Sequence, residues 1–409
     1  MPVAPRWLPT QNDKGRGIPP HAIVTLVSRM LVVATAGAGG DLQPLAAAAL
    51  ALRARGHEIL VLGDGTVARA LGTLDVHVET LPPELDLGPT LAGAIRAAMS
   101  QTGGDLQAAG PLVQERMTIW ARALADPVAA AVRLDHPDAV VTSLFGVEVL
   151  HLVSPSCPWA VVNSTFYVGP NAPRMLEEDF GPRAIPLIAR YASLLESADL
   201  VLHATDRVFD FSFEGLPPGH HYVGPLGTWE PPSGPPDYLG ESGDPWVLVS
   251  ISSQIQDDVP LARAAADALQ DKPVRVVLTI GPDHDPSELS AVPANVRVER
   301  VISHAAVLER AAMLVSHAGH GSVMKALWFG VPMVLVPWGR DQPGVAARAA
   351  ALEVAAVVPR DDASAEELSA AIDRVFSDGQ MREAAMRNGT RLRSMDAPGV
   401  AGALLEQLA

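Results

Sequence analysis

A short segment in the last third of the chain has the residue types of an anion-binding site. It runs His317-Ala-Gly-His-Gly-Ser322, between an apolar run that ends at Ser316 and a run with helical periodicity. A glycine-rich turn that opens a helix exposes free backbone N–H groups at the positive end of that helix, and glycines let a diphosphate approach the backbone. His317 adds a side-chain donor. The segment therefore predicts a diphosphate site.

A carboxylate and an amide follow the next predicted strand. Asp341 and Gln342 are adjacent in the sequence. Because the carboxyl ends of parallel strands share one edge of a sheet, we expect both side chains at the same edge as the diphosphate site. An adjacent carboxylate and amide can bind neighbouring hydroxyl groups of a sugar.

Parallel strands are needed to bring these residues to one edge, and the first half of the chain predicts them. Short β-branched runs alternate there with Ala- and Leu-rich segments of helical period. The order strand, glycine turn, helix, strand over residues 31–62 is a βαβ unit, whose crossover implies parallel strands. The predicted strands cover 31–35, 58–62, 139–142, 159–163 and 200–203, and the predicted helix covers 42–55.

The same pattern restarts after a proline-rich stretch. Residues 226–244 contain four prolines and little apolar periodicity, which favours an interdomain linker. Beyond it we predict strands at 246–251, 274–280, 296–301, 313–316 and 333–336, and helices at 259–270, 306–311 and 322–329. The expected fold is α/β, with two Rossmann-like, doubly wound domains that face each other across a cleft.

The second half of the chain resembles the C-terminal signature of the family 1 glycosyltransferases of GT-B fold. That signature runs His-Gly-Gly-x-Gly-Thr-x-x-Glu-Ala-Leu, then Gly-Val-Pro, then Pro and an Asp-Gln pair, then Asn-Ala-x-Arg. The chain keeps His317, Gly319, Gly321, Ala326, Leu327, Gly330, Val331, Pro332, Pro337, Asp341, Gln342, Ala346 and Arg348 in fixed spacing. The resemblance implies transfer of a sugar from a nucleotide donor.

The resemblance also implies a role for each donor-site residue: serines and the helix start hold the diphosphate, and the segment around residue 302 holds the base. Lys325 stands where the family has a glutamate that chelates the ribose hydroxyls. A lysine cannot accept from those hydroxyls, which favours a thymidine-type donor over a uridine one. His304 could form a wall of the base pocket, but we expect it to be a solvated histidine at a helix start. The donor-binding set is Ser252, Ser253, Ile302, His317, Gly319, His320, Gly321, Ser322, Lys325, Trp338, Asp341 and Gln342.

The N-terminal half resembles the first-strand loop of the same family. Gly40-Asp-Leu-Gln-Pro44 matches a bacterial natural-product subset, like the glycopeptide-antibiotic and sterol glucosyltransferases, that has Asp where other members have His. The resemblance implies that Asp41 is the general base for the acceptor and that His317 is the other catalytic residue. A single displacement with one base implies an inverting enzyme. The alternative is that Asp41 is only a helix N-cap.

The acceptor site is the least defined part of the sequence. Residues that follow strands of the N-terminal half are candidates, although a core position is as good a reading for the aromatic ones. The composition resembles that of proteins from GC-rich bacteria, which favours a small lipophilic natural-product aglycone attacked through oxygen or carbon. The candidates are His151, Asn163, Ser164, Phe166 and Tyr167.

The resemblance divides the chain into five parts. We expect a flexible extension over 1–29, an acceptor-binding domain over 30–226, a linker over 227–244, a nucleotide-sugar-binding domain over 245–396, and a last helix over 397–409 that crosses back to the first domain. The donor is a substrate, so no cofactor is expected. The protein is expected to be a monomer or a homodimer.

Composition excludes several other classes. The chain has 409 residues, 48% hydrophobic and 19% charged, with a formal net charge of −16. That charge argues against a nucleic-acid partner, and no apolar run approaches the ~20 residues of a membrane span. One cysteine excludes an intramolecular disulfide and favours the cytoplasm. The acidic pairs near residues 257 and 284 lie in turn-like sequence, so no metal site is expected.

Two other functions stay open at this stage. The glycines at 37–40 suggest an NAD- or flavin-dependent oxidoreductase, although their spacing is not Gly-x-Gly-x-x-Gly. A catalytically silent sugar-nucleotide-binding auxiliary protein would also carry the C-terminal signature.

Overall fold

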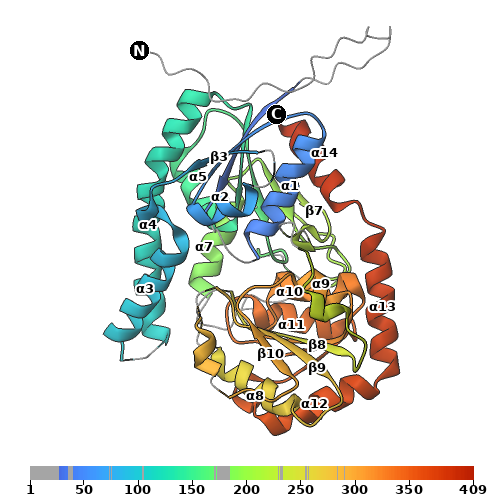
Figure 1. Cartoon of the computed structure of the whole chain (residues 1–409). Coiled ribbons are helices and arrows are strands. Elements are labelled where there is room, and N and C mark those ends of the chain that lie inside the picture. Colours follow the sequence, from blue (N-terminus) through green and yellow to red (C-terminus); the bar gives the residue numbers. More distant parts are fainter. Residues whose placement is uncertain are drawn as a thin grey trace, which may run out of the picture.

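Two α/β units make up the molecule, one above the other in Figure 1. The computed structural model describes residues 27–409 except 36–39, 73, 75, 104–105, 170–171, 173–184, 229, 231–233, 254–255, 257, 283 and 290. The expected extension over 1–29 and the glycines at 37–39 therefore lie almost wholly outside the described residues.

The first sheet has seven parallel strands in the order β3-β2-β1-β4-β5-β6-β7. Its interior strand β1 is apolar on both sides, because Leu31 and Val33 enter one core while Val32 and Ala34 enter the other. A strand buried on both faces needs such a continuous apolar run. The strands are β1 (Arg29–Ala34), β2 (Glu58–Gly63), β3 (His77–Thr80), β4 (Ala139–Ser143), β5 (Trp159–Asn163), β6 (Leu200–His203) and β7 (His220–Tyr222).

Helices cover both faces of this sheet, as in a doubly wound domain. One face carries α1 (Leu42–Ala54), α2 (Gly65–Leu71) and α14 (Ala397–Leu408). The other carries α3 (Leu87–Gln101), α4 (Leu106–Asp135), α5 (Val147–Val153) and α7 (Ile185–Leu195).

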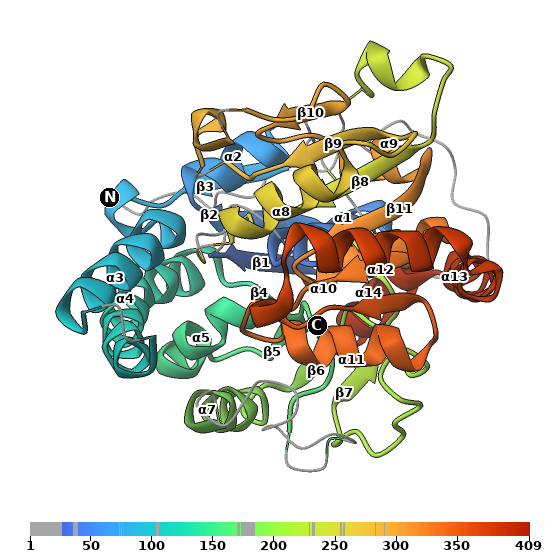
Figure 2. The same cartoon turned by 90° about the horizontal axis from the view of Figure 1, so that it is seen from below.

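The second sheet has six parallel strands in the order β10-β9-β8-β11-β12-β13. They are β8 (Trp246–Ser250), β9 (Arg275–Thr279), β10 (Val296–Glu299), β11 (Ala311–Ser316), β12 (Met333–Leu335) and β13 (Ala355–Val357). One face packs against α8 (Val259–Leu269) and α12 (Ala365–Ser377), which Figure 2 shows from below. The other packs against α9 (His304–Leu308), α10 (His320–Phe329), α11 (Gln342–Ala351) and α13 (Gly379–Arg393).

The chain passes between the two sheets twice. The stretch after β7 contains the short 3-10 helices η3 (Leu226–Thr228) and η4 (Asp237–Gly240) before β8 begins. After α13 the chain returns, and α14 lies beside α1 in the upper unit of Figure 1. Apolar side chains of α14 belong to the same core as those of β1 and α1.

One predicted helix is shifted. The helix expected over 306–311 begins earlier, at His304, because Ser303 accepts a hydrogen bond from the backbone N–H of Ala306 and caps it there. Its other end stops at Leu308, and residue 311 already starts β11.

Within the described part of the chain, none of the helices is both long enough and apolar enough to cross a bilayer.

Candidate functional site

Asp41 lies at the carboxyl edge of the first sheet, where α1 begins. It occupies the N-cap position, yet its side chain makes no capping hydrogen bond. The Ser164 hydroxyl instead donates to its Oδ1 at 2.8 Å, and among the described residues Oδ2 has no hydrogen-bond partner. The loop that follows β5, rather than α1, thus orients the carboxylate. Oδ2 is left able to accept a proton.

Burial sets the protonation of this carboxyl group. Asp41 is 5% exposed, and loss of solvent raises its pKa to about 6. The Ser164 hydrogen bond opposes that rise, as do the nearby Ser143 hydroxyl and the backbone of Phe145. A carboxyl group with a pKa near 6 is ionised at neutral pH and is a stronger base than an ordinary aspartate.

The start of α10 is the segment for which the sequence predicts an anion site. Gly319 is its N-cap, and His320, Gly321 and Ser322 form the first turn. A Cβ on Gly319 would lie 2.5 Å from Nε2 of His317, so only glycine leaves this ring in place. Free N–H groups, glycines and a ring nitrogen therefore meet at one helix end.

His317 is held in one orientation by the neighbouring strand. Its Nδ1 lies 3.2 Å from the backbone carbonyl of Ser250, which can only accept, so Nδ1 carries the proton in the neutral ring. Burial lowers the pKa of the ring. Nε2 is consequently an acceptor in the neutral form, and it becomes a donor only when an anion favours the imidazolium. This refines the prediction that the side chain is simply a donor.

The two domains touch where these features meet. A Cβ on Gly321 would lie 3.6 Å from Cα of Gly40, the residue that precedes Asp41. A Cβ on Gly227 would lie 3.9 Å from Cα of Gly321. The predicted base and the predicted anion site thus lie side by side, although nearly 280 residues separate them in the sequence.

His320 lies in the same contact. Its ring is buried, meets Phe209 edge to face with centroids 5.7 Å apart, and hydrogen-bonds to the backbone of Ser164. Burial lowers its pKa to about 3, so the ring is neutral at physiological pH. His320 of the second domain thus packs against Phe209 of the first.

Asp341 and Gln342 differ in what they face. Thr165 of the first domain donates a 2.6 Å hydrogen bond to Oδ2 of Asp341, so this carboxylate points across the domain boundary. Gln342 is buried and engaged at both ends: Oε1 accepts from the backbone of Trp338 and Gly339, and Nε2 donates to Gln256. Gln342 therefore shapes its own turn in this structure.

The remaining donor-set residues have contacts of their own. The backbone N–H of Ser252 donates to Asp258 at 2.8 Å, and Ser253 packs against the backbone of Gly281. Ile302 packs on the edge of a core, and the guanidinium of Arg360 lies 4.4 Å above the ring of Trp338.

Lys325 forms a buried ion pair, so its ammonium group is not free to contact a ribose. Its Nζ donates to Glu230 at 2.6 Å and to Gln43 at 2.8 Å, with 4% of the lysine side chain exposed. Glu230 comes from the stretch between the domains, and its other oxygen accepts from Ser303 at 2.6 Å. A carboxylate is therefore present beside position 325, supplied by a residue the sequence did not single out.

Two expectations about histidines are wrong. His304 is half-buried rather than solvated: its Nε2 lies 3.1 Å from Oγ1 of Thr279, and loss of solvent lowers its pKa to about 4. His151 is exposed and contacts Ser197, which precedes β6. Ser197 therefore lies at the amino ends of the parallel strands, whereas Asp41 lies at their carboxyl ends. His151 is thus at the opposite edge of the sheet from Asp41 and cannot belong to the same site.

The other acceptor candidates are packed inside the molecule. Asn163, Phe166 and Tyr167 are each at most 2% exposed. Asn163 binds the backbone carbonyl of Phe166 at 2.9 Å, and the guanidinium of Arg348 stacks 3.6 Å above the Phe166 ring. These side chains offer no surface to an acceptor in this structure. Arg348 of the second domain covers Phe166, whereas Asn163 and Tyr167 pack against His203 of the first domain.

The sequence singles out Arg348 as a signature residue but not its partner, and it misses the other residues that build this contact. Arg348 and Asp210 form a fully buried ion pair across the domains, with Nε 2.7 Å from Oδ1. Thr165 and Glu230 were also overlooked. Each pair joins positions more than 90 residues apart, and local sequence carries no signal of such partners.

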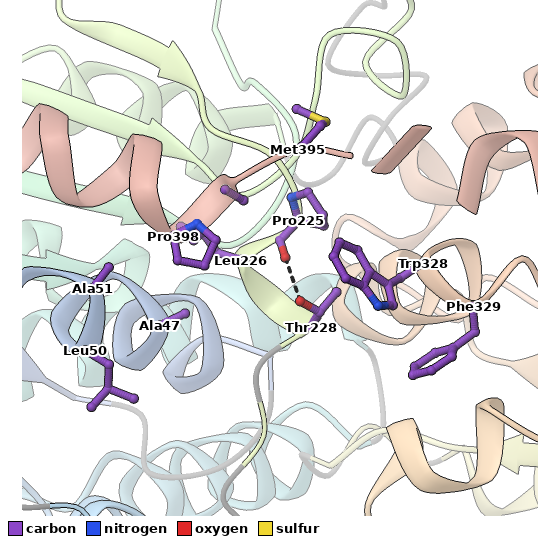
Figure 3. A pocket seen from close by; sticks show the side chains of 11 residues that line it. Ala47, Leu50, Ala51, Pro225, Leu226, Thr228, Trp328, Phe329, Met395 and Pro398 are labelled. Atoms are coloured by element: carbon purple, nitrogen blue, oxygen red, sulfur yellow. Dashed lines mark hydrogen bonds between the residues drawn. The ribbon is translucent and has the colours of Figure 1, made fainter. Parts of the chain in front are cut away.

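An apolar pocket of about 510 Å³ lies between α1, α14, η3 and α10 (Figure 3). Its walls include Leu50, Trp328, Phe329, Met395 and Pro398, and no titratable side chain lines it. It therefore has no groups for acid-base chemistry. The described residues also hold no cluster of three or more His, Cys, Asp or Glu side chains placed to bind a metal ion.

Comparison with known proteins places this arrangement in context. Residues 263–405 match the family described as "Erythromycin biosynthesis protein CIII-like, C-terminal domain". Demethyllactenocin mycarosyltransferase of Streptomyces fradiae is 30% identical over 49% of this chain, and the aligned part is 44% of that relative's own length. L-demethylnoviosyl transferase of Streptomyces niveus is 27% identical over 88% of this chain and 92% of its own.

A solved structure extends the likeness to the fold. The glycosyltransferase VinC in complex with dTDP superposes with a TM-score of 0.66 at 18% identity, covering 93% of this chain and 99% of its own. The predicted GT-B fold is confirmed, and so is the resemblance to family 1 glycosyltransferases.

Proposed function

We propose that this GT-B chain, similar to family 1 glycosyltransferases, is an inverting, metal-independent glycosyltransferase. It moves a hexose or deoxyhexose from a dTDP- or UDP-sugar to a small lipophilic natural-product aglycone, through an oxygen or an electron-rich carbon. One observation carries the proposal: Asp41, with its unpaired oxygen, adjoins the start of α10 through the contact between Gly40 and Gly321. A base and an anion site are thereby side by side.

The proposed mechanism follows from that juxtaposition. Asp41 accepts the proton of the acceptor nucleophile as it attacks the anomeric carbon. The C–O bond to the diphosphate breaks on the opposite side, so the configuration inverts. The N–H groups of residues 319–322, the Ser322 hydroxyl and a protonated His317 stabilise the departing diphosphate. Asp341 orients the sugar hydroxyls.

Similar proteins support the substrate classes. The names of the matched relatives describe transfer of mycarosyl and demethylnoviosyl groups, and VinC was solved with dTDP. We infer the same type of donor here, a place in antibiotic biosynthesis, and a cytoplasmic monomer or homodimer that needs no resident cofactor.

The test is an Asp41→Asn variant with a matched control. Product formation is measured with UDP- and dTDP-sugars against a panel of aglycones, and nucleotide binding by calorimetry. We expect Asp41→Asn to lose turnover at least 100-fold and to keep nucleotide binding. The control is Asp378→Asn, because Asp378 caps α13 of the second domain by accepting from the backbone N–H of Met381, and asparagine also caps. Wild-type turnover in Asp41→Asn, or thermal stabilisation by NAD alone, would reject the proposal.

A further inference from the structure

Two neighbouring residues of one loop hold the two carboxylates of the site. The loop follows β5 and contains Ser164 and Thr165. Ser164 donates to Oδ1 of Asp41 at 2.8 Å, and Thr165 donates to Oδ2 of Asp341 at 2.6 Å. Asp41 starts α1 of the first domain and Asp341 starts α11 of the second. The loop thus connects the two carboxylates through two short hydrogen bonds.

This loop is itself fixed from both sides. The Asn163 amide binds the Phe166 carbonyl and His203, each at 2.9 Å, and its Oδ1 accepts from the backbone of Thr165 at 3.3 Å. Arg348 of the second domain stacks on Phe166 at 3.6 Å. Because the loop backbone is held, the two hydroxyls have set positions and directions.

We propose that Ser164 and Thr165 are positioning residues. Ser164 turns Asp41 so that its Oδ2 is left for the acceptor proton. Thr165 holds Asp341 at the distance from Asp41 that the sugar and the acceptor require. This inference rests on the proposed function, since it takes Asp41 as the base and Asp341 as a sugar contact.

The groups around Asp41 make the role of Ser164 measurable. A hydroxyl that donates to the ionised carboxylate stabilises that form, so its removal raises the pKa of Asp41. Tyr191 of α7 feels the charge of Asp41, and its pKa is raised to about 12. The ring of His320 lies beside the backbone of Ser164, and its pKa is lowered to about 3. Neither group titrates near pH 6. We therefore assign to Asp41 the acid limb of the pH profile, that is, the fall in kcat/KM as the pH is lowered.

The decisive experiment is the pH profile of kcat/KM. In Ser164→Ala the acid limb is expected to move upward by about one pH unit, because one charge-assisted hydrogen bond is lost. Ser164→Thr keeps the hydroxyl and restores the wild-type limb. Should Ser164→Ala not fold, Ser164→Cys keeps the volume with a weaker donor and must shift the limb in the same direction. Ser197→Ala, at the opposite sheet edge, is the matched control.

The role of Thr165 is tested by a different quantity, the KM for the donor sugar. In Thr165→Val the KM for the donor sugar is expected to rise about tenfold while the acid limb stays at its wild-type pH. Thr165→Ser, which keeps the hydroxyl, restores the KM. A limb that stays fixed in Ser164→Ala, or a donor KM unchanged in Thr165→Val, overturns the inference. A limb that persists in Asp41→Asn instead rejects the proposed function, so the two failures are distinguishable.

Discussion

At the scale of single residues, burial rather than charge partners decides protonation. Asp41, His317 and His320 all lose most of their solvent, and each shifts toward its neutral form. An acid that is hard to ionise is a better base once ionised, and a histidine that is hard to charge responds to an arriving anion. The site therefore gains reactivity from the same burial that costs it stability.

Asp41→Asn is expected to stabilise the folded protein above pH 6. The folded pKa of about 6 lies above the ordinary value of 3.8, so the protonated form is favoured in the folded state. That contribution is fully present below pH 3.8 and is lost as the pH rises through 6. At pH 8 the variant should exceed the wild type by up to about 3 kcal/mol, and near pH 4 the difference should vanish.

Denaturant unfolding of both proteins at pH 4, 6 and 8 checks this. A stability difference that does not change with pH would contradict it. The expected gain also separates loss of turnover in this variant from loss of folding.

At the scale of elements, the His317 ring can lie beside the start of α10 because Gly319 has no Cβ to collide with it. Gly319 has φ −63° and ψ 132°, which any residue can adopt. Its constraint is steric, since a Cβ would meet the His317 ring, and that ring is fixed through Nδ1. The helix start and the histidine are therefore one unit.

Gly319→Ala is expected to weaken nucleotide binding at least tenfold, because the methyl group displaces His317 from the helix start. Calorimetric titration with UDP and dTDP measures the effect. Gly339→Ala is the matched control, since a Cβ there meets nothing within 4 Å. Equal affinity in the two variants would show that His317 moves aside without cost.

At the scale of the whole molecule, a buried ion pair joins the two domains. Arg348 and Asp210 have no exposed side-chain surface, and Asp210 also accepts from Tyr222 and from the backbone of Tyr167. Removal of one buried partner leaves the other charge without compensation, which costs more than the pair itself contributes.

Arg348→Met is expected to lower the free energy of unfolding by about 3–5 kcal/mol, and Arg348→Met with Asp210→Asn to recover much of that loss. Thermal or urea unfolding measures both. Arg207→Met provides the control, because its partner Glu214 is exposed and such pairs contribute at most about 1 kcal/mol. Similar losses for Arg348→Met and Arg207→Met would contradict the expectation.

Local sequence predicted much of the architecture. The predicted strands at 159–163 and 200–203 match β5 and β6, because a buried parallel strand needs an uninterrupted apolar run. Helix α4 carried no such signal: it runs for 30 residues through Pro111 and Pro127, which local rules take as helix breakers.

The site was predictable only where its chemistry is local. The start of α10 is encoded within six residues and was recognised. The partners of Asp341 and Lys325 lie 176 and 95 residues away, and the contact between the domains brings them together. Ser164 lies 123 residues from Asp41 in the sequence and reaches it across the edge of the first sheet. For Phe166 and Tyr167 the sequence favours neither the core nor an acceptor wall, because a short aromatic run after a strand does not reveal what will cover it.

The return of α14 has a consequence for synthesis of the chain. Ala401 and Leu405 complete the core that β1 and α1 begin, so the first domain made by the ribosome lacks part of its interior until the last helix emerges. The second sheet and its helices come from the continuous stretch 246–393 and have no such delay. The domain that is translated first is therefore the one that finishes folding last.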